Sequence, residues 1–230
     1  MTPSVSTVQA PSVSLLGGES SGKSSLAHAL ADHLKQQYGL RVTVVDEHLR
    51  EWCETEQRAP LAHEQAAIAL QQSALIHAAR AQPRTQLVIA DTSALMVAIY
   101  STLYFQDHSL LPGAIEQQRG HDLTLLMGLD LPWVGDGLFR DSPKLRADAD
   151  ALLRDRLNEA GLRFDTVYGH GERRLHNALR ALSPLLSPLL GGMPLADEPP
   201  ATKRSPAWVC EACSDPDCEH RLFTALLRKP

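Results

Sequence analysis

The chain has 230 residues, 43% hydrophobic and 21% charged, which is enough for one α/β domain with an appendage. Its net charge of -5, with no basic run, predicts no binding to DNA, whose phosphates attract positively charged surfaces. No stretch of about 18 apolar residues indicates a membrane span, and residues 1–11 lack the features of a signal peptide. We therefore expect a cytoplasmic protein with a disordered N-terminus.

Predicted strands and helices alternate along the chain. An apolar run at 13–16 ends in a glycine-rich turn, and a helix is predicted over 23–37. Further strands are predicted over 42–45, 87–90, 123–129 and 164–168, and further helices over 64–80, 93–104, 146–160 and 172–182. This order predicts a mostly parallel sheet with helices on both faces, a three-layer α/β sandwich. In such sheets ligands bind beyond the carboxyl ends of the strands.

The turn after the first strand carries the strongest motif. Gly17, Gly18, Glu19, Ser20, Ser21, Gly22, Lys23 and Ser24 match the pattern G-x-x-x-x-G-K-[ST] between a strand and a helix. In this pattern backbone N–H groups and the helix N-terminus surround the phosphates, Lys23 contacts the β- and γ-phosphates, and the Ser24 hydroxyl binds Mg²⁺. With Ser25 in the same helical turn, these residues predict a P-loop NTPase fold that binds ATP and magnesium.

Two predicted strands end in acidic residues. Asp91 follows the strand at 87–90, where a carboxylate can hold Mg²⁺, although the same residue can also cap the next helix. Asp46 and Glu47 follow the strand at 42–45 and are candidate general bases for an acceptor hydroxyl, or else part of a solvated turn. Phosphoryl transfer needs both kinds of carboxylate.

A glycine-containing segment at 136–141 can form a lid over the phosphates. Arg140 in this segment is a candidate catalytic cation, and Arg146 is a second one. Surface salt bridges are the alternative reading for both arginines.

Five segments resemble a known family in order and spacing. They are GGESSGKSSL (17–26), EHLRE (47–51), AHEQ (62–65), ADT (90–92) and LPWVGDGLFRD (131–141). Over residues 12–182 the chain resembles the nicotinamide riboside kinase domain of NadR-type proteins, a P-loop kinase group beside the AAA-like ATPases. The resemblance implies transfer of phosphate from ATP to the 5′-hydroxyl of a small nucleoside, nicotinamide riboside, in NAD salvage.

The resemblance also suggests which residues contact the acceptor. Trp133 would face the cationic nicotinamide ring, with packing in the core as the alternative role of this side chain. Glu47 and Arg50 would lie near the acceptor, and Asp136 is a further candidate contact beside the lid residue Arg140.

The C-terminal part has a different composition. Residues 183–206 hold six of the 15 prolines and are predicted to be a linker. Residues 207–230 form a cysteine-rich tail, in which Cys210, Cys213, Cys218 and His220 can supply a structural zinc site. Unligated thiols in a tail that docks a protein partner are the alternative. The chain would then be a regulatory or partner-binding ATPase, and a kinase of another small hydroxyl compound is a third possibility.

Overall fold

The computed structural model of the chain describes residues 9–134 and 142–191. Its elements, in chain order, are β1 (Ser12–Leu16), α1 (Lys23–Tyr38), β2 (Val42–Val45), α2 (His48–Glu56), the 3₁₀ helix η1 (Ala62–Glu64), α3 (Gln65–Arg80), β3 (Leu87–Asp91), α4 (Ala94–Phe105), α5 (Leu111–Arg119), β4 (Leu123–Met127), α6 (Pro143–Glu159), β5 (Asp165–Val167) and α7 (Gly171–Leu189). The predicted α/β fold of the P-loop NTPase type is confirmed.

The five strands form one parallel sheet in the order β2-β3-β1-β4-β5. Strand β1 therefore lies at the centre, and Leu15 is paired with Asp91 of β3 on one side and with Leu125 of β4 on the other. Because all strands run the same way, the ends of β3 and β4 meet the loop that follows β1.

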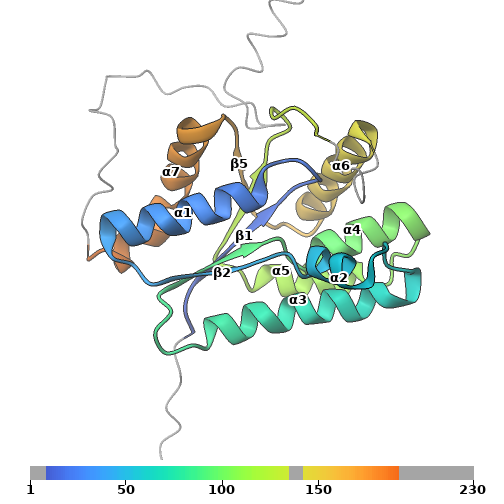
Figure 1. Ribbon diagram of the computed structural model, residues 1–230, viewed down its shortest axis with the longest axis horizontal. Coiled ribbons are helices and arrows are strands. Elements are labelled where there is room, and N and C mark those ends of the chain that lie inside the picture. Colours follow the sequence, from blue (N-terminus) through green and yellow to red (C-terminus); the bar gives the residue numbers. More distant parts are fainter. Residues whose placement is uncertain (1–8, 135–141, 192–230) are drawn as a thin grey trace, which may run out of the picture.

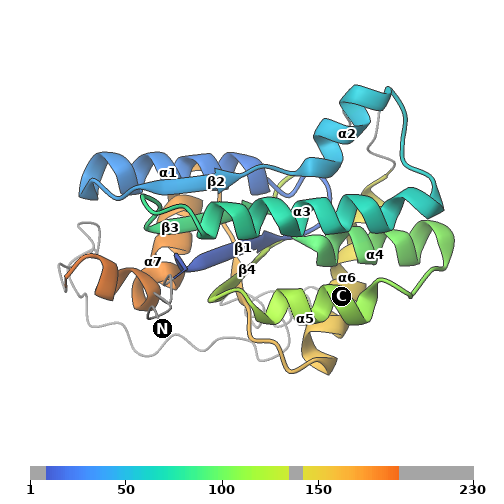
Figure 2. The ribbon, with the colours of Figure 1, turned by 90° about the horizontal axis from the view of Figure 1, so that it is seen from below.

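Helices cover both faces of the sheet (Figures 1 and 2). On one face α1 and α7 pack against alternate residues of the central strands, such as Val13 and Leu15. On the other face α3, α4, α5 and α6 pack around Leu16 and Leu126. This alternation follows from the two-residue period of a strand. No described helix has the length and apolar character that crossing a bilayer requires.

Two helices were not predicted from the sequence. Helix α2 is mostly polar and has only Leu49, Trp52 and Cys53 as apolar residues on its inner side, so its apolar stripe is too short to mark the helix in the sequence. Helix α5 begins with Leu111, Pro112 and Gly113, a sequence that suggests a turn. Proline is nevertheless compatible with the first helical turn, where its missing N–H group has no intrahelical partner.

The last described helix is longer than expected. The linker was predicted to begin at residue 183, but α7 continues to Leu189 with Pro184 and Pro188 inside it. Leu182 and Leu186 are fully buried against the core formed with α1. Burial of each leucine contributes about 1.5–3 kcal/mol, which offsets the roughly 3 kcal/mol cost of an interior proline.

The residues directly before β1 also differ from the prediction. Residues 1–11 were expected to be disordered, but Ala10 is buried, and it exchanges hydrogen bonds with Arg80 at the end of α3. Its N–H group donates to the Arg80 carbonyl at 3.0 Å, and the Arg80 Nε donates to the Ala10 carbonyl at 2.9 Å.

The extended α7 leads to a stability prediction. Leu186→Ala should lower the free energy of unfolding by about 2–5 kcal/mol, because it leaves a cavity in the core. Leu70→Ala, at a position 66% exposed on α3, should change it by less than about 0.5 kcal/mol. Urea unfolding of the two variants tests this. Equal small effects would show that residues after 182 behave as a linker.

A half-buried histidine precedes β4, at the amino ends of the strands. His121 Nδ1 lies 3.1 Å from Ser12 Oγ. Burial is the main cause that lowers the pKa of His121 from 6.5 to about 4, and the nearby Arg80 adds to it. The folded protein therefore holds this imidazole neutral over a range in which the unfolded chain would protonate it.

This shift predicts a pH dependence of stability. Between pH 6.5 and 4 the unfolded state binds the extra proton, so the free energy of unfolding should fall by up to about 3 kcal/mol as the pH is lowered. His121→Gln should remove this component and leave the contribution of the carboxylates. Urea unfolding of both proteins at pH 7 and pH 4.5 measures the difference. Parallel losses in the two proteins would contradict the assignment.

Candidate functional site

The loop between β1 and α1 is shaped by close contacts with its surroundings. A Cβ atom at Gly18 would lie 2.8 Å from Cγ of Arg146 and 3.1 Å from its carbonyl oxygen. Gly22 has φ +79°, and a Cβ atom there would lie 2.7 Å from Leu131 Cδ1. Glycine is therefore needed at both positions, at the first because α6 approaches closely and at the second also because of its left-handed backbone.

Lys23, the first residue of α1, folds its side chain back over the loop. It is only 9% exposed, and its Nζ donates to the carbonyl oxygens of Gly17 at 3.0 Å and Gly18 at 3.4 Å. An ammonium group has three donors, so one remains for a ligand at the loop. Ser24 follows, half-buried in the first turn of α1, and Ser25 is exposed.

A second buried cation lies against the same loop. Arg146 of α6 is 9% exposed, and its Nη1 donates to the carbonyls of Leu131 at 2.9 Å and Ser20 at 3.4 Å. Within the described ranges no carboxylate lies within ion-pair distance of Arg146 or Lys23. Carbonyl oxygens orient these cations but do not neutralise them, so in the described part of the chain the buried positive charge at the loop has no acidic partner within ion-pair distance.

Arg174 of α7 is different because it has an acidic neighbour. Its Nη1 lies 3.7 Å from Asp130 Oδ1, and it also donates to the carbonyl of Gly169. Burial lowers the pKa of Arg174, while Asp130 acts in the opposite direction. Its Nη1 lies 4.0 Å from where a Cβ atom of Gly22 would be. Arg174 therefore supports the loop from the β5 side.

Asp91 ends β3 directly beside the loop. It is 2% exposed, and in the described part of the chain its Oδ1 is buried and accepts no hydrogen bond. The next residue, Thr92, has φ +80°, which is rare for a β-branched residue, and its Oγ1 is likewise buried and unpartnered among the described residues. Two orphaned oxygen atoms at this position fit a hard cation such as Mg²⁺.

The other two predicted acidic residues, Asp46 and Glu47, follow the carboxyl end of β2. Asp46 is exposed after the edge strand β2, and its Oδ1 lies 3.1 Å from His28 Nε2 of α1. Glu47 is half-buried at the start of α2, and Arg50 is exposed one turn later. The structure therefore separates the solvent-facing Asp46 from the more enclosed Glu47.

A tyrosine that the sequence did not single out contacts the phosphate loop. The Tyr100 hydroxyl of α4 accepts the backbone N–H of Glu19 at 3.1 Å, and Tyr100 is 8% exposed. Burial raises the pKa of Tyr100 well above its ordinary value, and the charges of Glu19 and Glu47 raise it further. Two carboxylates therefore lie near one neutral phenol. Tyr104 is a second tyrosine of the same helix, so the sequence alone does not indicate which of the two contacts the loop.

Trp133 lies on the other side of the loop, in the connection between β4 and α6. It is half-buried, and its Nε1 has no hydrogen-bond partner in the described portion. The next residue, Val134, donates its N–H to Ser20 Oγ at 2.9 Å, which ties this segment to the phosphate loop. The remaining predicted site residues lie outside the described ranges: Asp136, Arg140, Cys210, Cys213, Cys218 and His220.

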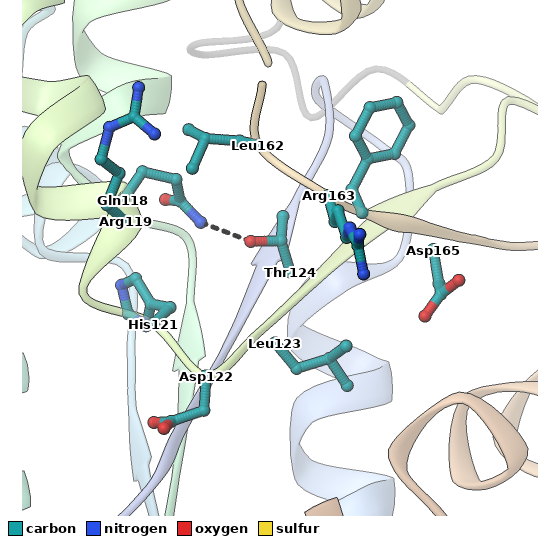
Figure 3. A pocket seen from close by; sticks show the side chains of 10 residues that line it. Gln118, Arg119, His121, Asp122, Leu123, Thr124, Leu162, Arg163 and Asp165 are labelled. Atoms are coloured by element: carbon teal, nitrogen blue, oxygen red, sulfur yellow. Dashed lines mark hydrogen bonds between the residues drawn. The ribbon is translucent and has the colours of Figure 1, made fainter. Parts of the chain in front are cut away.

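A pocket of about 350 Å³ lies at the amino ends of the strands, whereas the phosphate loop follows the carboxyl end of β1; Figure 3 shows the side chains that line the pocket. It is bordered by the end of α5, the start of β4 and residues 162–165. Gln118 and Thr124, which line it, are bonded to each other at 2.8 Å, and Asp122 accepts the Ser12 N–H. These hydrogen bonds stabilise the fold, and none of the predicted catalytic residues borders this pocket.

Solved structures with a similar fold include two of NadR protein. The chain is 22% identical to NadR protein in complex with NR, with a TM-score of 0.62 over 76% of this chain and 51% of that one. It is 20% identical to NadR protein in complex with NAD and AMP-PNP, with a TM-score of 0.61 over 81% and 51%. This chain thus spans about half the length of those proteins.

A thymidylate kinase from Ehrlichia chaffeensis is also similar, at 16% identity and a TM-score of 0.55, over 77% of this chain and 99% of that one. At these identities the likeness shows the fold. A comparison with curated proteins found no match. A family model described as an AAA domain matches residues 12–174, from β1 to the start of α7, and includes the whole phosphate loop. The chain belongs to this AAA domain family, AAA_28.

Proposed function

We propose that the protein is an ATP- and magnesium-dependent kinase of a small nucleoside, with the 5′-hydroxyl of nicotinamide riboside as the acceptor. The observation that carries the proposal is the buried charge of Lys23 and Arg146 at the phosphate loop, which no carboxylate of the described residues neutralises. Triphosphate oxygens would supply the missing negative charge, and the N-terminus of α1 favours the same ligand.

Asp91 and Ser24 would hold the magnesium ion. The orphaned Asp91 Oδ1 beside the loop and the Ser24 hydroxyl in the first turn of α1 are oxygen donors of the type that Mg²⁺ prefers. The ion would neutralise charge on the β- and γ-phosphates. Asp91 is buried because β3 is an interior strand, so its carboxylate would face the nucleotide and not bulk water.

Glu47, Glu19 and Tyr100 would form the acceptor side of the site. Their electrostatic coupling supports a common location beside the phosphate loop. Glu47 is better enclosed than Asp46 and is therefore the stronger candidate for the base that accepts the hydroxyl proton. A carboxylate-rich site suits a neutral or cationic nucleoside, and the two NadR structures, solved with NR and with NAD and AMP-PNP, support the same substrate class.

The proposed reaction can be tested directly by incubating the protein with ATP, Mg²⁺ and a panel of nucleosides. Nicotinamide riboside should give its monophosphate and ADP in equal amounts, measured by chromatography, and Lys23→Ala should give neither product. ADP release at a rate that no nucleoside changes would reject the kinase in favour of a regulatory ATPase. Turnover of another acceptor alone would reject the choice of substrate.

Asp91→Asn should weaken the binding of ATP in the presence of Mg²⁺ by about tenfold or more, because an amide is a poorer metal ligand than a carboxylate. Binding measured in EDTA should change little. Asp32→Asn, at an exposed position on α1, is the control. Calorimetry with a non-hydrolysable ATP analogue gives both affinities. A loss of the same size in EDTA would argue against a metal role for Asp91.

Tyr100→Phe should leave the Glu19 N–H without its partner and disturb the acceptor side of the loop. We predict a roughly tenfold fall in kcat/KM for the nucleoside, with ATP affinity within about twofold of the wild type. Tyr104→Phe removes an equivalent hydroxyl from a side chain that is 45% exposed and should behave as the wild type. If ATP and nucleoside kinetics declined together in Tyr100→Phe, Tyr100 would belong to the nucleotide site.

A further inference from the structure

Gln118 of α5 joins four elements through its buried amide group. It is 1% exposed and lies over the α4 and α5 face of the sheet. Its Nε2 donates to Ser14 Oγ of β1 at 2.6 Å and to Thr124 Oγ1 of β4 at 2.8 Å, the latter visible in Figure 3. Its Oε1 accepts the hydroxyl proton of Ser93 at 2.7 Å. Both amide protons and the carbonyl of this side chain are therefore used.

The bond to Ser93 completes the start of α4. Ser93 is the N-cap of α4, and its Oγ accepts the Leu95 N–H at 3.2 Å. A serine hydroxyl has one proton, and here that proton is donated to Gln118. Gln118 thus fixes the orientation in which Ser93 caps the helix.

Ser93 directly follows the turn that carries the two orphaned oxygens. Thr92 holds a left-handed backbone conformation that is unfavourable for a β-branched residue, so the surrounding structure must impose it. From β1, the Leu15 carbonyl accepts the Thr92 N–H at 3.1 Å. From α5, Gln118 holds Ser93. The Asp91–Thr92 turn is therefore fixed on both sides while its own Oδ1 and Oγ1 remain unpartnered in the described structure.

We propose that Gln118 is a positioning residue for magnesium nucleotide: it acts through Ser93 to hold the Asp91–Thr92 turn so that its oxygens point toward the cation. This inference rests on the proposed function, because it takes the ligand of the turn to be the magnesium ion of bound ATP. Gln118 itself lies behind the turn, between Ser93 and the pocket of Figure 3, so it would act without contacting the nucleotide.

A purely structural role makes a different prediction from a positioning role. If Gln118 only stabilised the core, its replacement would lower stability and leave the magnesium effect on nucleotide affinity unchanged in the molecules that remain folded. If it positions the turn, replacement would reduce the magnesium effect specifically. The ratio of nucleotide affinity with Mg²⁺ to that in EDTA separates the two roles.

The test uses the full chain with Gln118→Met, which keeps the side-chain volume and removes its hydrogen bonds. Leu111→Ala is the matched control, since it weakens the packing of the same helix without touching the Gln118 network. Calorimetry with a non-hydrolysable ATP analogue should show the magnesium ratio reduced at least about fivefold in Gln118→Met, with metal-free affinity within about twofold. The ratio should be unchanged in Leu111→Ala.

Amide hydrogen exchange provides a second measurement that does not depend on the metal. The Thr92 N–H should exchange faster in Gln118→Met than in Leu111→Ala, relative to the amides of β3. An unchanged magnesium ratio in Gln118→Met would overturn the inference and leave the proposed kinase standing. A wild-type protein that binds the analogue with no magnesium effect would overturn both this inference and the magnesium role of Asp91, and one that binds no nucleotide would overturn the proposed function as well.

Discussion

The site depends on positive charge that the fold buries at one loop. Lys23 and Arg146 lose most of their contact with water, and backbone carbonyls hold them in place without neutralising them. Burying an unpaired cation is costly, so such an arrangement needs either an acidic partner or an anionic ligand. Within the described residues no acidic partner is present, and the helix N-terminus at Lys23 adds to the positive potential. A phosphate ligand would supply the missing negative charge.

The strand order distributes the other charges around that loop. Because β1 is central, β3 brings Asp91 to one side, while the connection after β4 brings α6 and Arg146 to the other. The Glu19, Glu47 and Tyr100 group lies on the β3 side, and Trp133 lies on the β4 side. The sheet thus separates an acid-rich side, suited to a metal and a hydroxyl acceptor, from a cation-rich side suited to phosphate.

Local patterns predicted much of this arrangement, and tertiary contacts determined the rest. The glycine spacing before Lys23 predicted the loop because the pattern lies within eight consecutive residues, although Arg146 and Leu131 also pack against it. Asp46 and Asp91 look alike in the sequence, since each is an aspartate at the end of a predicted strand. They differ in burial because β2 is an edge strand and β3 is interior, which sequence alone did not reveal. The hydrogen bond between Tyr100 and Glu19 joins residues 81 positions apart, and the one between Gln118 and Ser93 joins residues 25 positions apart. No short sequence motif therefore indicates either side chain. The proline content also gave a wrong end for the last helix. Helix α7 continues through Pro184 because its leucines are buried.

The most direct test of the buried-charge account is the effect of ATP on unfolding of the wild type and of Arg146→Met, measured by urea titration. A ligand that binds only the folded protein at 100 times its Kd raises the free energy of unfolding by about 2.7 kcal/mol. The account predicts a gain of this order for the wild type and a much smaller gain for Arg146→Met at the same ATP concentration. No gain in the wild type at millimolar ATP would contradict it.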